Sequence, residues 1–129
     1  MKLTHIALHV PDAQHCADWY SQFCGMVEVL RHGVKEKPVI WLAYPEQREE
    51  FVMVLINGGP PQSVAEGDYS HLGFAVESRE EVDRLAAMAA EAGCLLWEPR
   101  EEAYPVGYYC GVLDPAGNQV EFSFGQPLG

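Results

Sequence analysis

The apolar residues of this chain alternate first with a strand-like and then with a helix-like spacing. Residues 1–10 follow a period of two, which predicts a strand with His5 and His9 on one face. A helical stripe follows, which Asp12 is suited to cap and which Gly25 is suited to close. Three strand-like runs come next, at about Val27–Val34, Val39–Tyr44 and Phe51–Asn57.

The same order of elements begins again in the second half of the chain. Ser70–Val76 predicts a strand, Ser78 and Glu81 form a capping box, and Gly93 is suited to end the helix that follows. The segment from Asp114 to Asn118 is a strong turn signal before the last strand. The three remaining strands are expected near Leu95–Trp97, Tyr108–Leu113 and Gln119–Phe124.

This internal repetition predicts the architecture. Residues 5–10 resemble residues 71–76 position by position, and each copy is followed by a capped helix and a closing glycine. We therefore predict an α+β fold of two tandem βαβββ modules that form a cupped mixed sheet. The expected boundaries, within a single domain 1–129, are module 1 at about 1–57, a linker at 58–67 and module 2 at about 68–125.

Charge and composition exclude several classes of function. Asp and Glu outnumber Lys and Arg by 19 to 8, so nucleic acid and anionic membranes would be repelled. No run approaches the roughly 20 apolar residues that span a bilayer, and the first residues do not read as a signal peptide. None of the four cysteines lies in a CxxC pair, so we expect buried thiols and a cytoplasmic protein.

Three residues are candidate metal ligands. His5 and His71 occupy the same position in the two copies, and Glu121 lies in an otherwise apolar last strand. Two neutral imidazoles and one carboxylate form a facial triad that leaves coordination positions open for a substrate. Taken singly, each of these residues is more often an ordinary core or surface residue, and the repeat is what favours the metal site.

Three segments resemble the vicinal oxygen chelate superfamily, which includes glyoxalase I, fosfomycin and bleomycin resistance proteins, methylmalonyl-CoA epimerase and type I extradiol dioxygenases. They are Thr4–Leu8, Asp68–Phe74 and Leu113–Glu121, and the last contains a DPxGN turn followed by xxE. The resemblance covers nearly the whole chain. It implies the glyoxalase/bleomycin resistance/dioxygenase-like fold, the metal ligands named above and a homodimer, with the metal site either within one chain or shared.

The sequence departs from particular members of that superfamily. Val54 stands where glyoxalase I has a fourth ligand, a Glu that also transfers protons. An ordinary glyoxalase I mechanism is therefore disfavoured. The Lys and Ser that fosfomycin resistance proteins place around a phosphonate have no counterparts in 99–102, and the additional His residues of the dioxygenases are absent after His71.

We therefore expect a divalent-metal-dependent enzyme whose small substrate chelates the metal through vicinal oxygens. Dioxygenase-like chemistry at Fe²⁺ is favoured, because the triad is open. A lyase or isomerase of the lactoylglutathione-lyase type, with Mn²⁺, Ni²⁺, Zn²⁺ or Co²⁺, is the second hypothesis. The third is a metal-free binding protein of the bleomycin resistance type.

Further residues are weaker candidates. Tyr108 and Tyr109, with Tyr104 beside them, are candidates for a catalytic acid, although such tyrosines more often pack structurally. His15 and His32 are expected at the surface. Substrate contacts are expected from His9, Trp41, Trp97 and Arg100, with a core or solvent-exposed position as the alternative.

Overall fold

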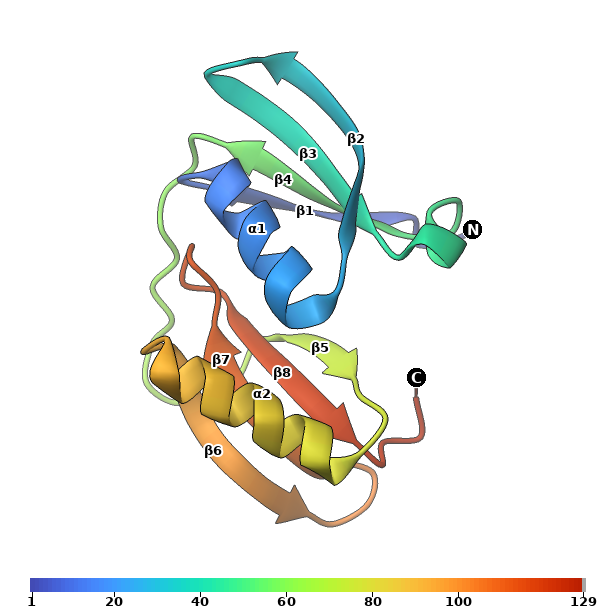
Figure 1. Cartoon of the computed structure of the whole chain (residues 1–129), viewed down its shortest axis with the longest axis vertical. Coiled ribbons are helices and arrows are strands. Elements are labelled where there is room, and N and C mark those ends of the chain that lie inside the picture. Colours follow the sequence, from blue (N-terminus) through green and yellow to red (C-terminus); the bar gives the residue numbers. More distant parts are fainter. Residues whose placement is uncertain (129) are drawn as a thin grey trace. The chain divides into compact units, whose positions relative to one another are not determined.

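The computed structural model describes residues 1–128, which form two compact units. The first unit is Met1–Gln62 and the second begins at Ser63, so the division falls inside the segment predicted as a linker. Each unit contains four strands and one long helix. Figure 1 labels these elements along the chain. The predicted α+β fold of two βαβββ modules is confirmed.

The first unit is a mixed sheet with one helix on one of its faces. Its sheet has the order β1-β4-β3-β2, in which β1 runs parallel to β4 and the other pairs are antiparallel. A short 3-10 helix, Pro45–Gln47, leads into the last strand and was not predicted. The elements are β1 (His5–Val10), α1 (Ala13–Cys24), β2 (Val27–Val34), β3 (Lys37–Ala43) and β4 (Val52–Asn57).

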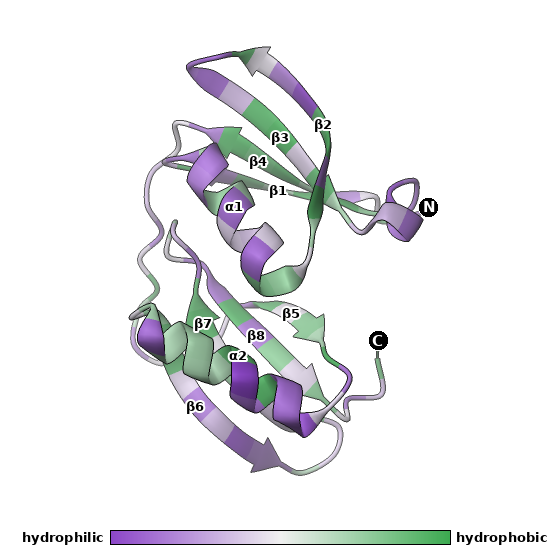
Figure 2. Ribbon diagram, viewed as in Figure 1, coloured by the Kyte–Doolittle hydropathy of each residue, from purple (hydrophilic) through white to green (hydrophobic). Residues whose placement is uncertain are grey.

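Local sequence signals account for the limits of α1. The Asp12 carboxylate accepts a hydrogen bond from the His15 backbone N–H at 2.9 Å, and Gly25 ends the helix with φ 68°. The apolar stripe of α1, including Tyr20 and Phe23, is buried. In Figure 2 the apolar colouring runs along β4, while α1 alternates between polar and apolar positions, as an amphipathic helix on a sheet requires.

The second unit repeats this arrangement. The Ser78 hydroxyl accepts a hydrogen bond from the Glu81 backbone N–H, which caps the helix as predicted. The sheet has the order β5-β8-β7-β6, with β5 parallel to β8. The elements are β5 (Leu72–Ala75), α2 (Arg79–Glu91), β6 (Leu95–Glu102), β7 (Gly107–Leu113) and β8 (Gln119–Phe124).

Two strand boundaries in the second unit differ from the prediction. The strand predicted near Leu95–Trp97 continues to Glu102. Pro99 is accommodated because β6 is an edge strand and its register shifts between Trp97 and Arg100. The first strand begins at Leu72, one residue after His71, so His71 belongs to the end of the preceding loop.

Three other expectations concern turns, thiols and membranes. Asp114 is buried and accepts hydrogen bonds from the Ala116 and Asn118 backbone N–H groups, which forms the predicted turn before β8. None of the four cysteines forms a disulfide within the described residues. Among residues 1–128, no helix is both long enough and apolar enough to cross a membrane.

Candidate metal centre

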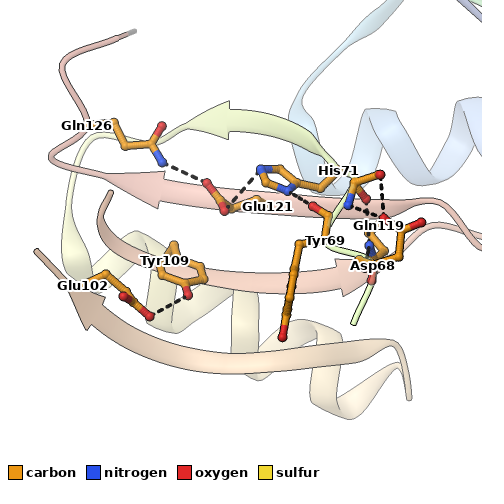
Figure 3. A network of polar contacts seen from close by, with 9 residues as sticks. Asp68, Tyr69, His71, Glu102, Tyr109, Gln119, Glu121 and Gln126 are labelled. Atoms are coloured by element: carbon orange, nitrogen blue, oxygen red, sulfur yellow. Dashed lines mark hydrogen bonds and ion pairs between the residues drawn. The ribbon is translucent and has the colours of Figure 1, made fainter. Parts of the chain in front are cut away.

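His71 and Glu121 meet on the face of the second sheet that α2 leaves open. The His71 Nε2 atom lies 3.4 Å from a Glu121 carboxylate oxygen. In Figure 3 a dashed line marks this contact. The Glu121 side chain is 7% exposed and the His71 side chain 34% exposed. The carboxylate is therefore buried, while the imidazole can still be reached from outside the unit.

The contact of His71 Nδ1 determines which of the two imidazole nitrogens carries the proton. His71 Nδ1 lies 2.6 Å from the Tyr69 main-chain carbonyl oxygen, and a carbonyl oxygen can only accept a hydrogen bond. Nδ1 must therefore carry the proton. In the neutral imidazole, the Nε2 lone pair then faces the carboxylate oxygen of Glu121. Two acceptors that face each other need either a proton or a cation between them.

The distance between these atoms fits a shared metal ion. Metal bonds to His nitrogen and to carboxylate oxygen are about 2.0–2.2 Å long, and two such bonds at a roughly tetrahedral angle separate the ligand atoms by about 3.4 Å. The pair matches that separation. Within the second unit, the described residues bring no third His, Cys, Asp or Glu to this pair. His5, the third predicted ligand, belongs to the first unit.

The loop that carries His71 is fixed by its neighbours. The Gln119 side-chain amide donates hydrogen bonds to the main-chain carbonyls of Asp68, at 2.9 Å, and Ser70, at 2.7 Å. Ser70 donates from its hydroxyl and its backbone N–H to the Asp68 carboxylate. These hydrogen bonds from Ser70 lower the pKa of Asp68. The hydrogen bonds from Gln119, which is on β8, thus hold the loop before β5 against the strand that carries Glu121.

Glu121 has a second polar partner and a glycine in register on each side. The Gln126 side-chain amide donates a hydrogen bond of 2.9 Å to the other Glu121 carboxylate oxygen. In register beside Glu121 lie two glycines, Gly73 on β5 and Gly111 on β7. Nothing lies within 4 Å of where a Gly73 Cβ would be, whereas the Trp97 ring fills the space above Gly111.

Aromatic rings border the pair. The centroid of the Trp97 ring lies 6.1 Å from that of His71 and 6.1 Å from that of Tyr69. Tyr69 is 69% exposed. Trp97 was predicted to contact substrate, and the structure brings it to the edge of the candidate site.

The two candidate tyrosines point to opposite faces of the sheet. Gly111 on β7 pairs with Glu121 on β8, so the two residues share a face of the sheet. Tyr109 lies two residues before Gly111 on the same strand and therefore points to that face as well. Tyr108 lies on the other face, where its hydroxyl donates to the Asp83 carboxylate of α2 at 2.7 Å. Only Tyr109 is thus positioned to act near Glu121.

Tyr109 is surrounded by charged groups of β6. Its hydroxyl donates a 3.3 Å hydrogen bond to Glu102, and the Arg100 guanidinium lies 5.5 Å from the centre of its ring. Burial is the main cause that raises the pKa of Tyr109. Tyr109 therefore stays protonated at neutral pH and can donate a proton or a hydrogen bond. Tyr104 is 82% exposed.

In the first unit, His5 lines a pocket on the face of the sheet opposite α1. His5, Ala7 and His9 alternate along that face of β1, as predicted, and the Thr4 hydroxyl lies 3.1 Å from His5 Nδ1. The pocket has a volume of about 510 Å³. Its walls come from all four strands of the first sheet and the turn before β4. The lining residues are Thr4, His5, Ala7, His32, Val39, Trp41, Arg48, Glu49, Glu50, Phe51, Val52, Val54 and Ile56.

The predicted substrate contacts lie in different parts of the structure. Trp41 lines the pocket of the first unit, and Trp97 and Arg100 border the open face of the second. His9 packs against Gly59 at the far end of β1 and does not line the pocket, so its contact with substrate stays a prediction.

Sequence reasoning missed three residues near these sites. Gln126, which binds Glu121, follows the last strand and carries no periodic signal. Tyr69 contributes through its main-chain carbonyl, which any residue has. His32 is exposed, as expected, but it also lines the pocket, and its pairing with Val39, a same-face neighbour of Trp41, is the signal that was available.

Comparisons with known proteins agree with the fold and the predicted family. The uncharacterized protein PA2024 of Pseudomonas aeruginosa is 56% identical over 127 residues, which cover 98% of this chain and 91% of that protein. The glyoxylase/bleomycin resistance protein/dioxygenase domain from Frankia sp. EAN1pec has a similar structure, with a TM-score of 0.73, 23% identity and 98% of each chain covered.

Two further similar structures belong to proteins of named function. The fosfomycin resistance protein FosX from Listeria monocytogenes has a TM-score of 0.74 and 20% identity, with 97% of this chain and 94% of that chain covered. Glyoxalase I from Leishmania major has a TM-score of 0.66 and 22% identity, with coverage of 96% and 86%. At these identities the likeness concerns the fold.

A sequence profile of the family matches nearly the whole chain, at residues 2–122. The match includes the two β-α modules and reaches β8, which carries Glu121. This chain therefore belongs to the Glyoxalase/Bleomycin resistance protein/Dioxygenase superfamily.

Proposed function

We propose that this protein is a divalent-metal-dependent enzyme acting on a small substrate that presents two vicinal oxygens to the metal. The observation that carries the proposal is the facing pair of His71 Nε2 and the Glu121 carboxylate, with the other His71 nitrogen committed to a carbonyl. A buried carboxylate opposite an imidazole lone pair is a ready-made pair of ligands for a cation.

We propose His5 as the third ligand. It is the counterpart of His71 in the repeat, and a two-His-one-carboxylate set leaves coordination positions open. A divalent ion held in this way would act as a Lewis acid on the substrate oxygens. The protein side of the chemistry would be orientation of the ligands by Tyr69 and Gln126 and a proton held by Tyr109.

Dioxygenase-type chemistry at Fe²⁺, in which both atoms of O₂ enter the substrate, is the first choice. Val54 is buried and apolar at the position where a fourth, basic ligand would stand, so a glyoxalase I mechanism lacks its base. The second candidate is a lyase or isomerase reaction with Mn²⁺, Ni²⁺, Zn²⁺ or Co²⁺. It is favoured by the fold shared with glyoxalase I and with a fosfomycin resistance protein whose structure holds Mn(II).

The decisive test is metal content of protein purified without a His tag or chelator. We expect near-stoichiometric metal in the wild type and its loss in Glu121→Gln and His71→Ala. Glu91→Gln is the matched control, since it removes an exposed carboxylate at the end of α2. If the wild type takes up neither Fe²⁺, Mn²⁺, Ni²⁺ nor Zn²⁺, the enzyme proposal fails and a metal-free binding protein remains.

The proposal includes a homodimer, in which His5 and the pair of His71 and Glu121 are supplied by different copies. Mixing His5→Ala subunits with Glu121→Ala subunits tests it. Shared sites predict that the mixture regains metal binding in every mixed dimer, up to one site each. Sites within one chain predict no recovery, and light scattering reports the oligomeric state independently.

A further inference from the structure

The open face of the first sheet is apolar, which is unusual for a sheet with a helix on only one side. Such a sheet normally presents polar residues on its uncovered face. Here Ala43, Val52 and Val54 form a buried cluster on that face. The partly buried residues that pack against this cluster are Val29, Val39, Trp41 and Ile56.

The turn before β4 converts this apolar face into a pocket. Exposed residues 48–51 form one wall, and the apolar cluster forms the floor. The volume of about 510 Å³ suits a small molecule, since ligand pockets commonly enclose about 300–1,000 Å³. Because the floor is apolar, it favours a ligand that is largely apolar. Because the floor is the face of a β-sheet, it favours a ligand that is flat.

The charges on the pocket wall decide against an anionic ligand. Arg48 makes no ion pair within the described residues, but Glu49 and Glu50 line the same pocket, so the wall carries one positive and two negative charges. Desolvating an anion beside two carboxylates is unfavourable. The apolar floor disfavours burial of a charge of either sign, so the part of the ligand that enters the pocket is uncharged.

Trp41 supplies a specific polar group. Its indole Nε1–H is buried and has no acceptor among the residues that the structure describes. An unpaired buried donor is destabilising, and an acceptor on a ligand would relieve it. The N–H is covered, so a ligand reaches it only when a neighbouring side chain moves. His32, whose ring centroid lies 6.2 Å from that of Trp41, is an exposed lining residue beside it.

We propose that this pocket binds a flat, uncharged, largely apolar group that carries one hydrogen-bond acceptor for Trp41 Nε1. This inference rests on the proposed function in one respect: His5, the proposed metal ligand, lines the same pocket, so the bound group is the body of the substrate next to its chelating oxygens. Binding to the pocket itself requires no metal.

Nuclear magnetic resonance of ¹⁵N-labelled wild-type protein tests the proposal directly, because the three tryptophans give three indole N–H signals. Three probes of one shape are titrated at neutral pH: naphthalene without an acceptor, quinoline with a neutral ring nitrogen, and the anion 2-naphthoate. We expect quinoline to shift the Trp41 indole signal and to bind roughly three- to tenfold more tightly than naphthalene, as one hydrogen bond allows.

Two variants isolate the cause. Trp41→Phe identifies the signal and should abolish the preference for quinoline over naphthalene. Ala7→Leu places a larger side chain on the exposed floor position of β1 and should weaken binding of both probes at least tenfold. Equal binding of quinoline and naphthalene, tighter binding of 2-naphthoate, or no binding of any probe at millimolar concentration would overturn the proposal.

The same titration on the Glu121→Gln variant separates this inference from the metal proposal. Unchanged quinoline binding in this metal-free variant would support the pocket independently of the metal. Quinoline binding in a wild type that takes up no metal would support the pocket while the enzyme proposal fails. Metal binding in the wild type without quinoline binding would leave the enzyme proposal standing and refute the substrate class.

Discussion

Gly111 supports the Trp97 ring beside the candidate metal ligands, and replacing it by alanine tests that contact. A Cβ at Gly111 would lie 2.1, 2.5 and 2.9 Å from three atoms of the Trp97 ring. Ordinary contact begins at 3.4 Å, so the nearest ring atom must withdraw by at least 1.3 Å, the difference between 3.4 and 2.1 Å. The atoms belong to the body of the ring, so the whole indole must move.

The expected cost of Gly111→Ala is about 1–3 kcal/mol of unfolding free energy, as for other overpacked sites. Trp97 would lose its packing against His71. Metal affinity should fall by less than about tenfold, because the Tyr69 carbonyl still orients the imidazole. Urea denaturation followed by tryptophan fluorescence measures the first effect, and metal titration measures the second.

Gly73→Ala is the matched control. Gly73 also lies in register with Glu121, but nothing is within 4 Å of its added Cβ and its φ is not in the left-handed region. This substitution should be neutral or should stabilise the protein by up to about 1 kcal/mol, because alanine has less freedom in the unfolded chain. If both variants unfold at the same urea concentration with unchanged fluorescence, Trp97 does not rest on Gly111.

Three further predictions concern single side chains. Gln126→Leu removes the amide bonded to Glu121 and should weaken metal binding by roughly 10- to 100-fold in a metal titration, with little change in urea midpoint. Asp114→Ala removes the carboxylate that accepts two backbone N–H groups and the Asn118 side-chain amide, and should cost about 2–4 kcal/mol in urea unfolding; a loss below about 1 kcal/mol would contradict this. Burial raises the pKa of Tyr44 to about 12 from its ordinary value of 10.0. The unfolded phenol therefore ionises first, so its contribution to stability is complete below pH 10 and is lost as the pH rises through about 12. Tyr44→Phe should flatten the alkaline part of the stability profile, and an unchanged slope would refute this assignment.

Much of the fold could be predicted because local signals and the repeat agree with each other. Asp12, Ser78 and Gly25 act at the helix ends as their residue types suggest. The alternation of β8 correctly separates Glu121 from its apolar neighbours. The strand β6 was predicted too short, since it continues past Pro99. Proline is tolerated there because β6 is an edge strand and its register shifts at that point.

The site was harder to predict, because its supporting contacts join residues that are distant in sequence or use the main chain. Gln119 reaches Asp68 and Ser70 across about fifty positions, and no periodicity encodes such a contact. The opposite facing of Tyr108 and Tyr109 follows from strand alternation, which sequence reasoning had not applied to them. The pairing of His71 with Glu121 required the parallel register of β5 and β8.

The parallel pairing of first and last strands in each unit has a consequence for biosynthesis. Each sheet is complete only when its last strand pairs with its first strand, β4 with β1 and β8 with β5 (Figure 1). Such distant pairing is slow to form, because the intervening chain must be ordered before the contact stabilises it. All four strands of the first sheet have been synthesised once Asn57 is reached, so this sheet can form while later residues are still being synthesised. Glu121 lies in β8, so the carboxylate of the candidate metal site reaches its native surroundings only after the first sheet is complete in sequence.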